Sequence, residues 1–207
     1  MAMQWMDRIP WPQLEADAEI LPRAFYVRPA AEVARALLGK ILVHRRSAGM
    51  IVEVEAYLGL EDLAAHASRG VTGRTRVLFG PPGRAYVYFI YGMYHCLNAV
   101  TESEGYPAAV LLRAVEPIAG VRESATGPGR LCRAMQIDLR LNREDLGGET
   151  LFVLGRARGD SPRVAAARRV GIDSIGGVWA RKPWRFFDAD SDAVSARPRR
   201  PRVLGPR

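Results

Sequence analysis

Two glutamates occupy alternate positions of a predicted β-strand at residues 50–57. Because alternate strand residues share a face, one face carries Ile51, Glu53, Glu55 and Tyr57. The two carboxylates then lie ~7 Å apart, near the separation used for inverting glycoside hydrolysis. A solvated polar face is the competing interpretation. Tyr57 on the same face and His66 just beyond it favour a site that cleaves a glycosidic bond.

A second candidate lies in residues 86–94, where five of nine residues are aromatic. Aromatic residues in strands commonly pack in a core, and that interpretation stays open. However, Tyr91, Gly92 and Met93 fall at a predicted turn, where large apolar side chains meet solvent. On a basic protein, an aromatic hairpin tip is typical of a wedge between base steps or a platform for stacked bases.

Several other chemistries are excluded by their missing motifs. The three histidines, His44, His66 and His95, lack metal-ligand spacing, and no phosphate-binding G-x-x-x-x-G-K-[ST] loop or zinc-deaminase pattern occurs. Cys96 and Cys132 are too few for a structural zinc site or a disulfide framework. We therefore expect no metal and no cofactor.

Length and composition predict one globular domain. The chain has 207 residues, of which 48% are hydrophobic and 25% charged, ordinary values for a protein with a buried core. No apolar run approaches the ~20 residues of a membrane span, and the N-terminal residues do not read as a secretory signal. We expect a cytoplasmic, nucleoid-associated protein of bacterial type with no membrane partner.

The charge is unevenly distributed. The net charge is +8, and residues 151–207, with 13 basic and 5 acidic residues, account for all of it. Arginine provides 28 of the 30 cations; the lysines are Lys40 and Lys182. A GC-rich genome explains arginine over lysine but not the local excess. This basic third fits either a polyanionic partner or a solvated surface.

The predicted elements form an α+β domain with a mostly antiparallel sheet. Helices are expected at 29–39, 127–135 and 161–169, the last from its Ser-Pro start. Strands are expected at 41–44, 50–57, 85–90, 94–101 and 109–115, with a turn at 47–49 between the first two. Residues 1–20 are expected to form an irregular leader, 21–190 the domain, and 191–207 a basic, disordered tail.

Long blocks of this sequence resemble the alkyladenine (3-methyladenine) DNA glycosylase family, of methylpurine-DNA glycosylase type. They occur in order between about residues 20 and 187: IVEVEAYLG with Glu61-Asp62 and Ala65-His66, YVYFIYGMY with Cys96-Leu97-Asn98, VLLRAVEP, GPGRLC, and Arg169-Val170-Gly171-Ile172 with RKPWRF. The resemblance implies a curved antiparallel sheet with surrounding helices and a protruding β-hairpin that inserts into DNA.

The resemblance also implies residue roles in hydrolysing the N-glycosidic bond of a flipped purine. Glu55 is implied to be the general base that activates water, with Arg113 and the Val170 carbonyl holding that water. The implied base-binding residues are Tyr57 on one side of the purine, His66 and Tyr88 on the other, and Asn98 at its edge. Tyr91 is implied to fill the gap left in the duplex, supported by Met93.

Three further expectations accompany the resemblance. Glu53 matches the family pattern, but we assign it structural support of the strand. Thr72-Gly73-Arg74-Thr75 replaces the family's usual Thr-Pro-Arg-Asn run, so phosphate contacts there are open, although Arg74 is retained. Because strand cleavage by a glycosylase typically proceeds through an amine Schiff base, and neither lysine is near Glu55 in sequence, we expect a monofunctional enzyme.

The expected partner is double-stranded DNA that contains alkylated or deaminated purines, with no obligate protein partner and a monomer as the default. One alternative is a non-catalytic DNA-lesion binding protein, which needs Tyr91 but not Glu55 and Arg113 together. Another is an RNA-binding module with stacking tyrosines, which prefers single strands and ignores lesions.

Overall fold

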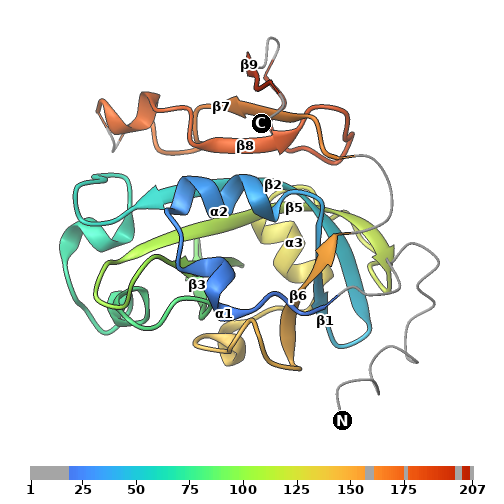
Figure 1. The fold of residues 1–207 in the computed structure, drawn as a ribbon, viewed down its shortest axis with the longest axis horizontal. Coiled ribbons are helices and arrows are strands. Elements are labelled where there is room, and N and C mark those ends of the chain that lie inside the picture. Colours follow the sequence, from blue (N-terminus) through green and yellow to red (C-terminus); the bar gives the residue numbers. More distant parts are fainter. Residues whose placement is uncertain (1–18, 157–160, 175–176, 199–201, 206–207) are drawn as a thin grey trace.

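The fold was analysed in a computed structural model that describes residues 19–156, 161–174, 177–198 and 202–205. These residues form one sheet in which every strand pair is antiparallel (Figure 1). The strands are β1 (Lys40–His44), β2 (Ser47–Leu58), β3 (Ala85–Ile90), β4 (Tyr94–Thr101), β5 (Ala108–Ala119), β6 (Leu151–Arg156), β7 (Val164–Ala167), β8 (Arg185–Asp188) and β9 (Arg202–Val203). The predicted α+β class with an antiparallel sheet is confirmed.

The strand order is β3-β4-β5-β2-β8-β7-β9, and β1 joins β2 to β6. The α-helices of the described chain are α1 (Arg23–Tyr26), α2 (Ala30–Leu37) and α3 (Pro128–Ala134). Short 3-10 helices are η2 (His66–Arg69), η3 (Thr75–Phe79), η4 (Leu139–Leu141) and η5 (Trp179–Arg181). No helix in these residues is long and apolar enough to cross a membrane.

Helix α2 covers the centre of the sheet, over β2 and β5 (Figure 1). It begins after Pro29, whose fixed φ suits a helix start. Residues 30, 33, 34 and 37 are buried, and this 3.6-residue spacing places one apolar stripe on the sheet. Together with α3, it forms the main core against β2, β4 and β5.

Strand β2 is buried because it lies between β5 and β8, so the solvated-face interpretation of its glutamates is wrong: Glu53 and Glu55 are both 0% exposed. The β2–β5 register shifts on both sides of Glu53, and the pairing passes over Val52 and Arg113. Such irregularities re-aim side chains. The prediction that Ile51 shares the glutamate face is therefore wrong: Ile51 packs in the apolar core with Val54.

Two local predictions are wrong. The turn after β1 lies at Arg45-Arg46, with Arg45 at a φ of 56°, and residues 47–49 already belong to β2. Residues 164–167, predicted to be helical, form strand β7. Their alanines favour a helix locally, but β7 pairs with β8 on one side and β9 on the other, and this tertiary pairing overrides the propensity.

The predicted N-terminal leader and C-terminal tail have different outcomes. Most of the predicted leader, residues 1–18, lies outside the described residues. Residues 191–198, expected in the tail, pack on the domain: Val194 is buried against Ala165 and Phe187, and Ser195 reaches the centre of the sheet. Residues 202–203 pair with β7 as β9.

Candidate active site

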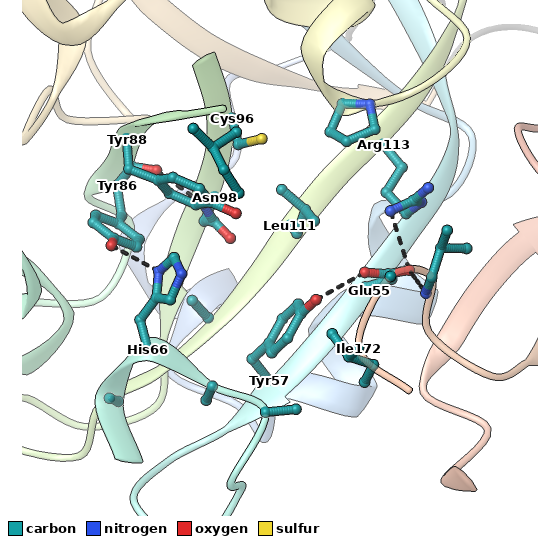
Figure 2. A pocket seen from close by; sticks show the side chains of 18 of the residues that line it. Glu55, Tyr57, His66, Tyr86, Tyr88, Cys96, Asn98, Leu111, Arg113 and Ile172 are labelled. Carbon is teal, nitrogen blue, oxygen red and sulfur yellow. Dashed lines mark hydrogen bonds and ion pairs between the residues drawn. The ribbon is translucent and has the colours of Figure 1, made fainter. Parts of the chain in front are cut away.

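A pocket of about 830 Å³ opens beside β2, and most of the predicted site residues line it. Figure 2 shows two groups facing each other across this space, with Leu111 of β5 between them. One group comprises Glu55, Tyr57 and Arg113, joined by Val170. The other comprises His66, Tyr86, Tyr88 and Asn98. The structure therefore brings together segments that are more than a hundred residues apart in sequence.

The Glu55 carboxylate is held by hydrogen bonds on both oxygens. Its Oε1 accepts from the Val170 backbone N–H at 2.8 Å and faces Arg113 Nη1 at 3.2 Å, while Oε2 accepts from the Tyr57 hydroxyl at 2.9 Å. Burial raises the pKa of Glu55, against the opposing effects of Arg113, the Val170 N–H and the Tyr57 hydroxyl. A carboxylate with a raised pKa binds a proton more readily than an ordinary glutamate, so Glu55 can act as a proton acceptor.

Arg113 connects the two glutamates. Its Nε donates to Glu53 Oε1 at 2.9 Å, and its Nη1 pairs with Glu55. Glu53 also accepts from Arg185 Nη1 at 3.0 Å. The two carboxylates therefore do not form an acid–base pair across a bond: Glu53 belongs to a buried ion cluster behind Glu55.

His66, Tyr86 and Tyr88 form an aromatic wall opposite Tyr57. The His66 and Tyr88 rings lie 4.6 Å apart between centroids, and His66 Nδ1 is 2.9 Å from the Tyr86 hydroxyl. Burial and the nearby Arg74 and Arg69 lower the pKa of His66 to about 4. His66 is therefore neutral at physiological pH, and its uncharged ring adds a flat aromatic surface to this side of the pocket.

The segment that departs from the family run supports this wall. Arg74 Nε donates to the Tyr86 hydroxyl at 3.3 Å, and its guanidinium lies 4.8 Å from the Tyr88 ring centroid. Thr72 and Thr75 bond reciprocally through their side chains and backbone N–H groups. The sequence suggests phosphate contacts for Arg74, whereas in the structure its side chain contacts the pocket aromatics Tyr86 and Tyr88.

A buried ion pair supports the Tyr57 ring, and the sequence alone indicates no role for its two members. The Arg169 guanidinium lies 4.5 Å from the Tyr57 ring centroid and pairs with Asp62, and both charged side chains are fully buried. Asp62 also accepts from the backbone N–H groups of Leu58 and Ala64. Because Asp62 and Arg169 are 107 residues apart in sequence, no local pattern indicates that they pair.

Asn98 is buried on β4, and its Nδ2 donates to the Tyr86 carbonyl at 3.0 Å. This bond fixes the side-chain amide within the pocket lining. The rigid amide can present a constant shape to the edge of a ligand.

The hairpin of β3 and β4 carries the exposed aromatic tip. Tyr91 is 78% exposed with a φ of 55°, and Met93 is 65% exposed. Tyr91 also lines the pocket mouth, whereas Met93 does not. The core interpretation therefore holds for Tyr86 and fails for Tyr91.

The described residues contain no group of three or more histidine, cysteine or acidic side chains that could hold a metal ion. Neither lysine lines the pocket. Ser195 and Ala196 line the pocket, although the sequence predicts that they belong to a disordered tail.

The chain is similar to known proteins over most of its length. A family model described as methylpurine-DNA glycosylase matches residues 24–192. Curated relatives named "Putative 3-methyladenine DNA glycosylase" include one from Methanocella arvoryzae, 51% identical over 86% of this chain and 96% of its own. Others come from Anaeromyxobacter sp. strain Fw109-5, 52% identical over 86% and 93%, and Legionella pneumophila strain Corby, 47% over 84% and 97%. The chain belongs to the methylpurine-DNA glycosylase family.

Proposed function

We propose that this DNA glycosylase flips alkylated or deaminated purines out of duplex DNA and hydrolyses their N-glycosidic bond with a water activated by Glu55. The observation that carries the proposal is the buried Glu55 carboxylate at one side of a pocket with aromatic rings on both sides. A glycosidic bond is inaccessible inside a stacked duplex, so such a pocket requires an extruded nucleotide.

The flipped purine stacks between Tyr57 and the His66–Tyr88 pair. The exposed Tyr91 ring occupies the space that the base leaves in the duplex, with Met93 beside it at the hairpin tip. Inserting an apolar side chain offsets part of the cost of unstacking. The Asn98 amide, held by its bond to the Tyr86 carbonyl, reads the purine edge and rejects the exocyclic amino group of normal guanine by steric conflict.

Hydrolysis then needs no covalent intermediate. The water oxygen forms a bond to the sugar C1′ and its proton passes to Glu55, while the C1′–N bond breaks and its electron pair leaves with the base. The sugar becomes oxocarbenium-like in the transition state, and the Glu55 carboxylate also stabilises that positive charge. Arg113 and the Val170 N–H hold Glu55. Arg113 and the Val170 carbonyl help to hold the water. The products are a free base and an abasic site.

The test is base release from a duplex oligonucleotide that carries one hypoxanthine or one methylated purine, without added metal. We expect wild type to yield strand breaks only after alkaline treatment, and Glu55→Gln to bind the lesion without releasing it. Tight lesion binding by wild type without release would instead identify the non-catalytic binder.

We further propose that the enzyme is monofunctional, because neither Lys40 nor Lys182 lines the pocket and a Schiff base requires an amine at the sugar. Borohydride added during turnover should trap no covalent protein–DNA complex. A trapped complex would contradict this part of the proposal.

A further inference from the structure

Residues 189–198, here called the C-terminal strap, follow β8 and return to the centre of the sheet. The family match ends at residue 192, so the far half of the strap lies beyond it. The strap is anchored on the domain: the Ser191 hydroxyl donates to Glu116 Oε1, and Val194 is buried beside Phe187. The Arg197 side chain donates to the Ala189 carbonyl at 3.1 Å, which holds the two ends of the strap together.

Ser195 completes a ring of contacts around Arg113. Its backbone N–H donates to Glu53 Oε2 at 2.6 Å, and its hydroxyl accepts from Arg113 Nη2 at 3.1 Å. Glu53 Oε1 in turn accepts from Arg113 Nε at 2.9 Å. The backbone N–H of Ser195 therefore contacts Glu53, and its hydroxyl contacts Arg113.

This ring sets the direction of the remaining guanidinium nitrogen. A guanidinium is planar, so fixing Nε on Glu53 and Nη2 on Ser195 also fixes Nη1. That nitrogen faces Glu55 Oε1 at 3.2 Å. Two cations, Arg113 and Arg185, balance two anions, Glu53 and Glu55, and all four side chains are buried. A buried cluster of this kind tolerates little misplacement.

Arg185 ties the strap to the segment that carries Val170. Its guanidinium donates to the Ser195 carbonyl at 3.0 Å, the Ala196 carbonyl at 3.1 Å and the Arg168 carbonyl at 3.0 Å. Ala196 adopts a φ of 44°, a left-handed conformation that costs energy for alanine. The strap is thus held in a strained geometry directly beside the pocket that Ser195 and Ala196 line.

We propose that Ser195 is a positioning residue of the glycosylase: together with Glu53 it orients Arg113 against Glu55, so that the C-terminal strap completes the catalytic corner of the pocket. The inference rests on the proposed role of Glu55. It adds a contribution from a part of the chain that the family match does not include.

The test compares Ser195→Ala, which removes only the hydroxyl, with Ser195→Thr, which retains one. Ser47→Ala is the matched control, because Ser47 also loses a side-chain hydrogen bond, to Gly120, but lies at the start of β2 outside the active-site pocket. We expect Ser195→Ala to lower the single-turnover rate of base release by about tenfold, the worth of a hydrogen bond to a charged group. Lesion binding should be unchanged, and the acid limb of the rate profile should move to higher pH.

Ser195→Thr should restore the rate, and Ser47→Ala should match wild type. A wild-type rate and pH profile for Ser195→Ala would overturn the inference, as would an equal loss in the threonine variant. A ¹³C titration of the Glu55 carboxyl in the free protein separates the two proposals, because it needs no turnover. If wild type releases no base, the proposed function fails, whereas an unchanged Glu55 midpoint in Ser195→Ala contradicts the positioning role alone.

Discussion

The Tyr57 hydroxyl donates a 2.9 Å hydrogen bond to Oε2 of Glu55, two residues earlier on the same face of β2. The other side of the Tyr57 ring is supported by Arg169, 4.5 Å from its centroid. Under the proposed function, this one side chain both stacks on the base and donates a hydrogen bond to the general base. Base binding and the protonation state of Glu55 would then be coupled through Tyr57.

Tyr57→Phe should separate these two roles. The ring remains, so lesion binding should be retained, but the lost hydrogen bond raises the pKa of Glu55 further. We expect a roughly tenfold lower single-turnover rate at neutral pH. Tyr26→Phe is the matched control, because the Tyr26 hydroxyl is buried without a partner and its removal should not destabilise the fold. Equal rates for Tyr57→Phe and wild type would show that this bond is dispensable.

The rate of base release should rise with pH as Glu55 loses its proton. Burial raises the pKa of Glu55, so the acid limb should lie above the ordinary range of a glutamate. A rate that stays flat down to pH 4 would contradict Glu55 as the base.

His66 should make the fold sensitive to acid. Its pKa is about 4 in the folded state against 6.5 when unperturbed. Between these values the unfolded state binds more protons, so stability is complete above pH 6.5 and falls as the pH drops toward 4, by at most about 3 kcal/mol. Denaturant melts of wild type and His66→Gln across this range should diverge at low pH, with a flatter dependence for the variant. Parallel curves would refute the linkage.

The buried Asp62–Arg169 pair should matter for stability far more than a surface pair. Asp62→Asn leaves the Arg169 cation buried without its counter-charge, and we expect a loss of about 3 kcal/mol in the free energy of unfolding. Asp190→Asn is the control: Asp190 pairs with Arg163 at 2.5 Å, but both are exposed, so no measurable loss is expected. Comparable denaturation midpoints for the two variants would argue against this difference.

Tyr91→Ser should impair base flipping without affecting the fold. Tyr91 is largely exposed, so the unfolding free energy should change by less than about 0.5 kcal/mol. Base release from duplex lesions should slow by at least about tenfold, since unstacking is no longer offset. Val27→Ser, an exposed apolar residue at the end of α1, serves as the control. Unchanged release by Tyr91→Ser would exclude the wedge role.

Sequence patterns that span only a few residues predict much of the secondary structure and the fold class. The strands around Tyr91, the helix after Pro29 and the antiparallel class follow from alternation, turn residues and helix-start signals, which are local. Local patterns predict a helix at 164–167, which is wrong, because the conformation of these residues is determined by pairing of β7 with the strands on either side. Strict alternation along the strand also predicts the wrong face for Ile51, because the register shift at Glu53 depends on the partner strand β5.

The sequence by itself determined that Glu55, Tyr57, His66 and an aromatic hairpin tip belong to one family pattern. Only the tertiary structure decided that Glu53 and Glu55 are buried, that Arg113 joins them, and that Arg74 and Ser195 support the site. The reason is physical. Burial and pairing of charges depend on which strands flank β2 and where a distant segment returns, and neither is encoded within a local window of residues.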